Sequence, residues 1–311
     1  MRLIIINGDV FAPEALGDKA VLIENGKILE ITDHVGDFDG DVLDASGLHI
    51  VPGFIDIHVH GGGGRCCMEG TAESVLAMAN AHARFGTTTI LPTTWTAPVA
   101  EIEQAIDAVR EASTLSCDAT IAGVHLEGPF LSAEQSGAQD PETLKAPADA
   151  DWKSLIDRWG GIRMVGAAPE LPGAMELGAA LAKRGIVASI AHSNAFEPEI
   201  CAAVQHGFSD VTHLYSGCST FVRRNGFRIP GVVECALAWD ELTVQVIADG
   251  KHLPETMLKL IWNAKGTDKI SLITDGLDFS ASELEEGSVY TQQNGMDVVY
   301  EDGVMKLMNR Q

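Results

Sequence analysis

The chain has 311 residues, of which 46% are apolar and 6% are aromatic. A chain of this length and composition can bury a large core, and one α/β barrel would use most of it. Forty-four acidic residues against 21 basic ones give a formal charge of -23, which disfavours nucleic acid or an anionic membrane as the main partner.

The N-terminal segment and the cysteines indicate where the protein is expected to work. The apolar run at residues 3–6 is too short for a signal sequence or a membrane span. None of the six cysteines has the C-x-x-C spacing of a zinc knuckle or a redox motif, so reduced thiols are expected. We therefore expect a soluble, cytoplasmic protein.

Residues 1–50 are expected to form a small β domain. Three short β-rich runs cover residues 3–6, 20–23 and 27–31, and an Asn-Gly pair follows the first run and precedes the third. Asn-Gly between apolar runs favours a tight hairpin turn. The pattern predicts a small antiparallel β element.

Residues 51–311 alternate between strand and helix patterns. Apolar strands are expected at 53–59, 87–92, 121–126, 187–191, 210–214, 243–248 and 270–274, and helices at 71–85, 98–113 and 254–264. Repeated strand and helix units imply a parallel sheet, and this many units favours a (β/α)8 barrel of the TIM type. After Asp275, runs at 288–290, 297–300 and 304–307, the last preceded by Asp302-Gly303, predict a C-terminal β hairpin.

Two histidines stand at the end of the first barrel strand. His58 and His60 are two residues apart, so their side chains face the same side of the strand. This spacing suits two imidazoles that converge on one metal ion. Packed or surface histidines are commoner, but glycines 61–64 follow directly and favour a position at the barrel mouth.

Polar residues also end four later apolar runs: Glu127, His192, His213 and Asp275. Each alone would more often be a cap, a turn or a hydrogen-bonded core residue. Together they would meet at the barrel face where catalytic groups from different strands assemble. Carboxylates and imidazoles suit Zn²⁺ or Fe²⁺ with an open coordination position. A metal-activated water is then the expected nucleophile, with Asp275 as its proton shuttle.

Seven motifs in fixed order cover nearly the whole chain. They are P-G-F-I-D-x-H-x-H-G (52–61), H-L-E-G-P-F (125–130), A-P-E (168–170), H-S-N-A (192–195), T-H-L-Y (212–215), A-D-G-x-H (248–252) and L-I-T-D (272–275). This series resembles the N-acetylglucosamine-6-phosphate deacetylase family of the amidohydrolase superfamily. The resemblance implies metal-dependent hydrolysis of the N-acetyl group of N-acetylglucosamine 6-phosphate, to glucosamine 6-phosphate and acetate, in amino-sugar catabolism.

The resemblance also implies a role for each candidate residue. One divalent ion would be held by Glu127, His192 and His213, a second could be held by His58 and His60, and Asp275 would be the acid/base. His252 would contact the substrate and Arg228 its phosphate. Where the family has an Asn-Ala pair and a substrate histidine, this chain has Ser216-Gly217 and Gln139. These three residues are therefore also expected at the substrate.

The basic loop around Arg228 departs from the family pattern. Arg223, Arg224 and Arg228 cluster in an acidic chain, and arginine forks suit phosphate oxygens. A solvated loop is the alternative interpretation for Arg223 and Arg224.

Members of the resembled family continue past the C-terminal hairpin into a last barrel helix and strands that complete the β-sandwich domain begun by residues 1–50. This sequence ends at Asn309-Arg310-Gln311, so we expect a C-terminally truncated member without these elements. Exposing on the order of several hundred Å² of apolar surface would cost many kcal/mol at roughly 25 cal/mol per Å². A homodimer could cover part of that surface.

Two alternatives to the sugar deacetylase stay open. The first is an amidohydrolase that acts on another N-acyl substrate, such as a dihydroorotase-like enzyme or an N-acyl amino acid deacylase. Those enzymes usually carry a barrel lysine that bridges two metals, and no lysine here lies at a plausible strand end. The second is a catalytically inactive, truncated fragment that binds metal. Metal content without hydrolysis of any N-acetyl amino-sugar phosphate would indicate such a fragment.

Overall fold

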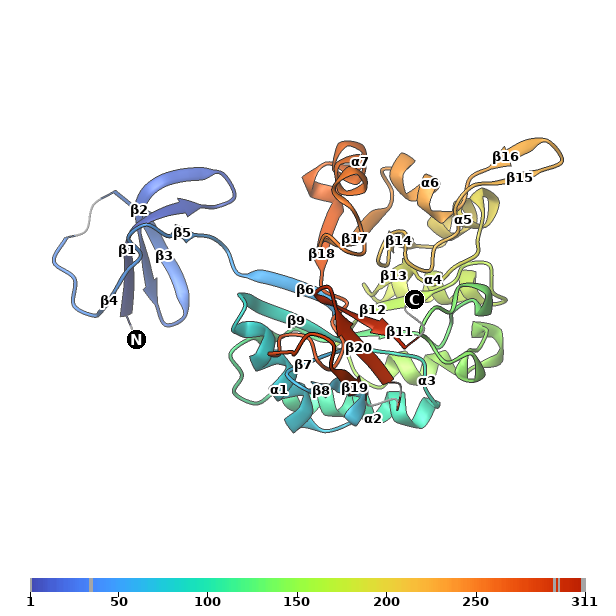
Figure 1. Ribbon diagram of the computed structural model, residues 1–311, viewed down its shortest axis with the longest axis horizontal. Helices are drawn as coiled ribbons and strands as arrows, with labels where there is room; N and C mark the ends of the chain where they lie inside the picture. Colours follow the sequence, from blue (N-terminus) through green and yellow to red (C-terminus); the bar gives the residue numbers. More distant parts are fainter. Residues whose placement is uncertain (1, 34–35, 293–294, 296, 309–311) are drawn as a thin grey trace. The chain divides into compact units, whose positions relative to one another are not determined.

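The computed structural model describes residues 2–33, 36–292, 295 and 297–308 (Figure 1). The chain divides into two compact units, Met1–Phe54 and Ile55–Gln311. The expected domain boundary after residue 50 lies close to this division and stays a prediction. In the described part of the chain, no helix combines the length and the apolarity that crossing a bilayer requires.

The first unit is one mixed sheet. It contains β1 (Arg2–Phe11), β2 (Ala15–Glu24), β3 (Lys27–Thr32), β4 (Asp41–Asp44) and β5 (His49–Ile50). The order is β3-β2-β1-β4, and β5 also pairs with β1. β1, β2 and β3 are antiparallel as expected, but β4 and β5 run parallel to β1. The expectation of a purely antiparallel element was therefore wrong.

The two Asn-Gly pairs of this unit behave differently. Asn25-Gly26 joins β2 to β3 with φ angles of 51° and 76°, as a tight hairpin turn requires. Asn7-Gly8 lies inside β1, where the pairing register with β2 shifts between Ile5 and Gly8. The turn expected at residues 7–8 was therefore wrong. Asn7 has a φ of 63°, and a β-bulge uses this conformation as readily as a turn does.

The second unit contains a nearly closed barrel of eight parallel strands. In order of pairing they are β6 (Phe54–Val59), β9 (Thr87–Thr94), β11 (Val124–Glu127), β12 (Ile162–Ala167), β13 (Val187–Ile190), β14 (Phe208–Val211), β17 (Thr243–Ile247) and β18 (Ile270–Ile273). β10 (Thr120–Ile121) also pairs with β9. The expected (β/α)8 barrel is confirmed, and β12 adds a strand to those expected.

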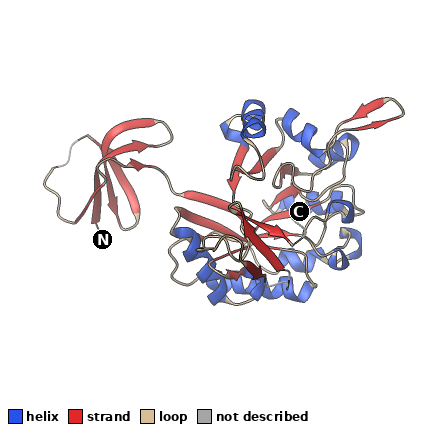
Figure 2. Cartoon of the chain, in the orientation of Figure 1, coloured by secondary structure: helices blue, strands red, loops and turns tan. Residues whose placement is uncertain are grey.

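Helices surround the barrel strands (Figure 2). They are α1 (Ala72–Ala83), α2 (Val99–Ala112), α3 (Trp152–Asp157), α4 (Ala174–Lys183), α5 (Glu197–Gln205), α6 (Val232–Ala238) and α7 (Glu255–Lys265). The three expected helices are confirmed as α1, α2 and α7. Apolar side chains between the strands and these helices, such as Leu126, Leu177 and Ile261, are buried and belong to one core.

Among its described residues, the unit also contains three smaller sheets. β7 (Gly61–Gly62) pairs with β8 (Arg65–Cys66), and β15 (Val222–Arg224) pairs with β16 (Phe227–Ile229). The C-terminal sheet contains β19 (Val289–Thr291), β20 (Asp297–Glu301) and β21 (Val304–Leu307), all antiparallel. The C-terminal hairpin is therefore confirmed.

A buried carboxylate joins β6 to β18 where the barrel closes. Asp56 accepts hydrogen bonds from the backbone N–H of His58 at 3.2 Å, the backbone N–H of Thr274 at 3.4 Å and the Thr274 hydroxyl at 2.6 Å. Burial raises the pKa of Asp56, and these hydrogen bonds partly offset that effect. Directly above, the Asp275 N–H donates to the His58 carbonyl at 2.9 Å. One carboxylate thus ties the strand of His58 to the turn of Asp275.

We expect Asp56→Ala to destabilise the protein by about 2 to 4 kcal/mol, because it leaves the buried N–H of His58 and the N–H and hydroxyl of Thr274 without their acceptor. Urea denaturation measures the loss. The matched control is Asp151→Ala, which removes an exposed carboxylate that accepts the Ser154 N–H at the start of α3. That change should cost about 1 kcal/mol. Equal losses in both variants would contradict a special role of Asp56 in joining β6 to β18.

Candidate metal centre

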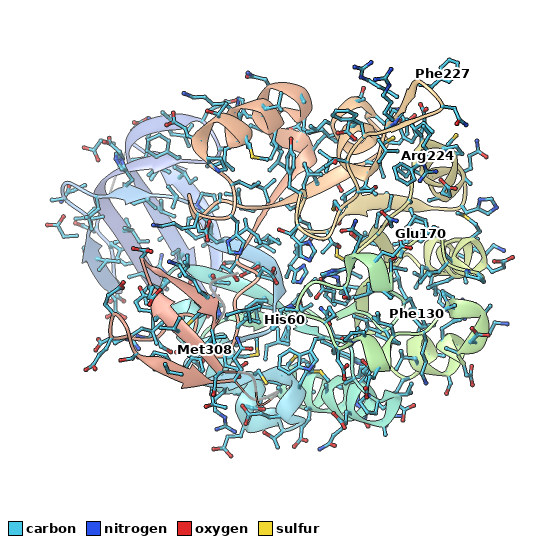
Figure 3. The ribbon with its side chains drawn as sticks, turned by 45° about the vertical axis from the view of Figure 1, so that its right-hand side comes forward. His60, Phe130, Glu170, Arg224, Phe227 and Met308 are labelled. Atoms are coloured by element: carbon cyan, nitrogen blue, oxygen red, sulfur yellow. The ribbon has the colours of Figure 1, made fainter. Side chains whose placement is uncertain are left out.

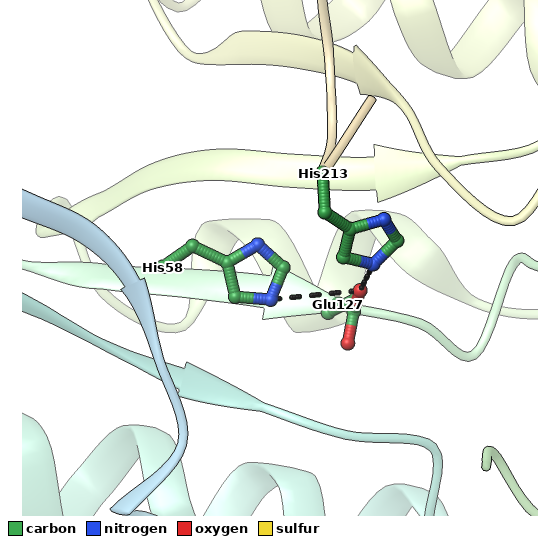
Figure 4. Close-up of side chains that lie close together, drawn as sticks. All are labelled: His58, Glu127 and His213. Atoms are coloured by element: carbon green, nitrogen blue, oxygen red, sulfur yellow. Dashed lines mark hydrogen bonds and ion pairs between the residues drawn. The ribbon is translucent and has the colours of Figure 1, made fainter. Parts of the chain in front are cut away.

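The carboxylate of Glu127 lies in the middle of four imidazole rings. Its Oε1 atom is 2.8 Å from His213 Nε2, 3.2 Å from His192 Nε2 and 3.5 Å from His58 Nε2. Its Oε2 atom is 3.3 Å from His60 Nε2. Figure 4 shows the ring nitrogens of His58 and His213 directed at this carboxylate. Glu127 is 1% exposed, so the rings replace water around it.

Asp275 joins the cluster from the turn after β18. Its Oδ1 atom lies 3.2 Å from His60 Nε2 and 3.4 Å from His58 Nε2. All six residues expected to bind metal or move protons are therefore brought together. Their individual roles stay predictions.

Among the described residues, two sets offer ligand atoms that all lie within 4.8 Å of one another. One set is His58, Glu127 and His213, and the other is His58, His60 and Asp275. His58 belongs to both sets, whereas His192 reaches the cluster through Glu127. His58 is thus shared between the two sets, whereas the sequence analysis expected it only at the second ion.

Three of these residues have an uncommon backbone conformation. His192, His213 and Asp275 have φ angles of 41°, 26° and 51°, which few residues other than glycine adopt. Each comes two residues after a barrel strand ends, after β13, β14 and β18 respectively. Strain of this kind concentrates at functional sites, where the surrounding structure has to maintain it.

The second ring nitrogen of each histidine is held by an acceptor. Three Nδ1 atoms face backbone carbonyl oxygens: His60 faces Thr93 at 3.0 Å, His192 faces Gln135 at 2.7 Å and His213 faces Ser216 at 3.0 Å. A carbonyl oxygen only accepts, so in each ring Nδ1 carries a proton. A neutral ring of this tautomer turns the lone pair of Nε2 toward the carboxylates. Lone pairs and carboxylates repel unless a positive charge lies among them.

The pKa shifts likewise indicate that positive charge is needed between the rings and the carboxylates. Burial raises the pKa of Glu127, but the charge of His58 and the hydrogen bonds from the rings outweigh it and hold the pKa well below its usual range. Burial lowers the pKa of His60, yet hydrogen bonds to Asp275 and Glu127 raise it to about 10. Protons on the rings can supply this charge, and a divalent cation would replace them. The nitrogen and oxygen donors therefore fit a divalent ion.

Gln139 contacts the central carboxylate. Its Nε2 donates to Glu127 Oε2 at 2.7 Å, while its Oε1 accepts the backbone N–H and the hydroxyl of Thr96 at 2.8 Å and 3.0 Å. Thr96 therefore fixes which end of the amide faces Glu127. The expected role of Gln139 at the substrate stays a prediction.

Ser216 and Gly217 lie against two histidines of the cluster, His213 and His192. The Ser216 carbonyl holds His213, as described above. A Cβ atom on Gly217 would lie 2.7 Å from Nδ1 of His192, and Gly217 also has a φ of 57°. Glycine therefore leaves room for the ring and adopts this conformation without strain. Contact of either residue with a substrate stays a prediction.

His252 and Arg228 lie outside the cluster of ligand atoms. His252 follows β17, its side chain is 50% exposed, and its Nδ1 is 2.7 Å from Asp249 Oδ2. Arg228 lies on the β15–β16 hairpin, opposite Arg223. Figure 3 shows another residue of this hairpin, Phe227, well apart from His60. Their contacts with substrate and phosphate stay predictions.

Two buried polar residues escaped the sequence analysis. Gln245 and Asp210 are 0% and 2% exposed, and they interrupt the apolar strands β17 and β14. A polar residue in the middle of a short apolar run was the available signal. It is a weak signal, because such residues also occur on the exposed faces of strands.

The sequence profile of the amidohydrolase family matches residues 49–288. The chain is 33% identical over 259 residues to the N-acetylgalactosamine-6-phosphate deacetylase of Shewanella sp. (strain ANA-3), covering 79% of this chain and 64% of that protein. It is 32% identical over 284 residues to the N-acetylglucosamine-6-phosphate deacetylase of Lysinibacillus sphaericus, covering 88% and 72%. The chain thus spans less than two thirds of the first relative and more than two thirds of the second.

A solved structure agrees over the whole chain. The crystal structure of N-acetylglucosamine-6-phosphate deacetylase from Pasteurella multocida has a TM-score of 0.88 to this chain at 27% sequence identity. The match covers 100% of this chain and 80% of that structure.

We expect Gln139→Leu to weaken metal binding by about 10- to 100-fold, because Glu127 loses the donor that orients it. Competition with a chelator measures the affinity. Gln135→Ala is the matched control, since its backbone carbonyl, which holds His192, is retained. The control should bind metal within about threefold of the unchanged protein. Unchanged affinity in Gln139→Leu would contradict this role.

We expect the metal-free protein to lose stability as the pH rises from 6.5 toward 10. Because the pKa of His60 is raised from 6.5 to about 10, the folded chain keeps a proton that the unfolded chain releases. This stabilisation is complete below pH 6.5 and is lost as the pH rises through the folded pKa.

Thermal unfolding in EDTA across this range measures the effect. The fall should be smaller in His60→Gln and in the metal-loaded protein, where the ion replaces the proton. A metal-free melting temperature that rises with pH would contradict the prediction.

Proposed function

We propose that this chain, which belongs to the amidohydrolase family, hydrolyses the N-acetyl group of N-acetylglucosamine 6-phosphate to glucosamine 6-phosphate and acetate. The observation that carries the proposal is the convergence of four histidines and two carboxylates at the carboxyl ends of the barrel strands. That end of the barrel is where enzymes of this fold place their reactive groups. The names of the relatives support the substrate class.

Membership of the family implies a divalent metal ion, and the buried donor set fits one. We propose Zn²⁺ as the bound ion, with Fe²⁺ as the alternative that the same ligands suit. Glu127, His192 and His213 would hold one ion, and His58 and His60 would hold a second. When bound, the ion supplies Lewis-acid polarisation of the acetyl carbonyl and a lowered pKa of water.

Asp275 would be the acid and base of the reaction. Burial raises its pKa, but the charge of His58 and the hydrogen bond from His60 outweigh burial and lower the pKa to about 2. The side chain is therefore a carboxylate before the reaction and can take a proton from the attacking water. As the water oxygen bonds to the acetyl carbon and the C–N bond breaks, Asp275 returns that proton to the leaving amine nitrogen.

The remaining candidates would recognise the sugar phosphate. In this proposal His252 and Arg228 contact the substrate and its phosphate, and arginine suits phosphate because its fork can donate two parallel hydrogen bonds. Gln139, Ser216 and Gly217 border the metal-facing rings, so a sugar bound at the centre would meet them. A cytoplasmic homodimer is part of the same proposal.

N-acetylgalactosamine 6-phosphate is the second candidate substrate. It is favoured by the similarity to the Shewanella deacetylase named for that sugar, at 33% identity. The two sugars differ only in the configuration at C4. The ratio of their kcat/KM values therefore decides which substrate the chain prefers.

We expect zinc-loaded protein to release acetate from N-acetylglucosamine 6-phosphate, and Asp275→Asn to lower kcat by about 10²- to 10⁴-fold. The control is Asp302→Asn, an exposed carboxylate in the β20–β21 turn, which should keep full activity. No acetate from either sugar phosphate, with metal bound to folded protein, would indicate another N-acyl substrate or an inactive fragment. Full activity in Asp275→Asn would refute its assigned role.

A further inference from the structure

We propose that Gln245 and Asp210 are positioning residues that hold His58 in the tautomer able to bind a metal ion. The inference rests on the proposed metal site and extends it below the ligands into the barrel interior. It is carried by a buried chain of side chains from β14 through β17 to β6. Neither residue touches the reacting atoms.

The chain of contacts has two links. His58 Nδ1 is 3.0 Å from Gln245 Oε1, and Gln245 Nε2 is 2.7 Å from Asp210 Oδ2. His58 and Gln245 are both 0% exposed and Asp210 is 2% exposed. Water therefore cannot substitute for either link.

The contacts of Gln245 determine which way its amide faces. Its Nε2 group lies between Asp210 Oδ2 and the sulfur of Met164, which is 3.1 Å away. Both partners accept hydrogen bonds, so the NH₂ end belongs there. A rotated amide would place its oxygen against a carboxylate oxygen and a sulfur atom. The Oε1 atom therefore faces His58.

An oxygen that faces His58 Nδ1 settles the tautomer of the ring. Because Oε1 only accepts, Nδ1 carries the proton and Nε2 presents its lone pair to Glu127 and Asp275. With the amide rotated, an N–H group would face Nδ1, and the proton of a neutral ring would move to Nε2. A protonated Nε2 cannot bind a metal ion.

The groups around Asp210 leave Oδ2 as an acceptor both when the carboxylate is ionised and when Oδ1 carries a proton. The Thr243 hydroxyl is 2.6 Å from Asp210 Oδ1 and 3.2 Å from the Ser209 carbonyl. If Oδ1 carried a proton, it would donate to Thr243, which would donate to Ser209. In both states Oδ2 accepts from Gln245 and from Ser189, whose hydroxyl is 2.7 Å away.

His58 differs in this respect from the other three histidines. Their Nδ1 atoms face backbone carbonyls, which cannot rotate. The Nδ1 atom of His58 faces a side-chain amide, whose two ends have opposite hydrogen-bonding character. An additional residue, Asp210, is therefore needed to fix its direction. Since His58 belongs to both sets of ligand atoms, the tautomer affects the whole centre.

The test is a double-mutant cycle on Zn²⁺ affinity, measured by competition with a chelator. Gln245→Met removes the acceptor with little change in volume. We expect it to weaken Zn²⁺ binding by about 10- to 100-fold in the unchanged protein. In a His58→Ala background the same substitution should change the affinity by less than about threefold, because Gln245 acts through His58. Equal losses in both backgrounds would overturn the inference, as would unchanged affinity in Gln245→Met.

The control is Thr243→Val, which removes a hydrogen bond from the same carboxylate but leaves the path to His58 intact. It should keep Zn²⁺ affinity within about threefold, and an equal loss there would make the network merely structural. Should Gln245→Met fail to fold, Gln245→Asn, whose shorter side chain cannot reach both partners, serves in the same cycle.

The affinity measurement also separates this inference from the proposed function. If the unchanged protein binds Zn²⁺ with this dependence on Gln245 but releases no acetate, the substrate assignment fails and the positioning role stands. If the unchanged protein binds no Zn²⁺, both the metal site and the positioning role are refuted.

Discussion

The carboxylate of Glu127 has lost its water, and a buried carboxylate costs several kcal/mol unless positive charge or hydrogen bonds compensate for it. In this barrel the compensation comes from imidazole nitrogens on three other strands or strand ends, from β6, β13 and β14, and from the amide of Gln139. Each of these groups must reach the same point at the barrel rim. The positions of the strand ends, the turns that follow them and the acceptors behind the rings all serve that requirement.

An imidazole whose Nε2 is to bind a metal ion carries its proton on Nδ1, and that buried N–H needs a hydrogen-bond acceptor. Backbone carbonyls hold three rings, one carbonyl in β9 and two in segments that follow β11 and β14, whereas the ring of His58 depends on the interior of the barrel. The interior below the site is therefore polar, with Asp210 and Gln245 in place of the apolar side chains that usually fill a barrel of this size. Polar groups in such a position are stable only when every member has a partner, and the contacts of Ser189 and Thr243 provide those partners.

Barrel closure and site geometry depend on one another where β6 meets β18. Asp56 belongs to the same short segment as His58 and His60, and it binds the residue next to Asp275. A shift between β6 and β18 would therefore move the proposed acid/base relative to two proposed ligands. This coupling explains why a carboxylate is retained at a buried position below the ligands, where burial raises its pKa.

The sequence by itself determined the barrel, the order of its motifs and the six residues that meet at its rim. Period, strand length and the rule that parallel strands end at one face are local or topological, and they can be read from one chain. Tertiary structure decided what the Asn-Gly pair at 7–8 does, since bulge and turn share one backbone conformation. It also decided that His58 is shared between both ligand sets, and that Gln245 and Asp210 stand behind it. Such contacts join residues up to 187 positions apart, and no local pattern encodes which of them will meet.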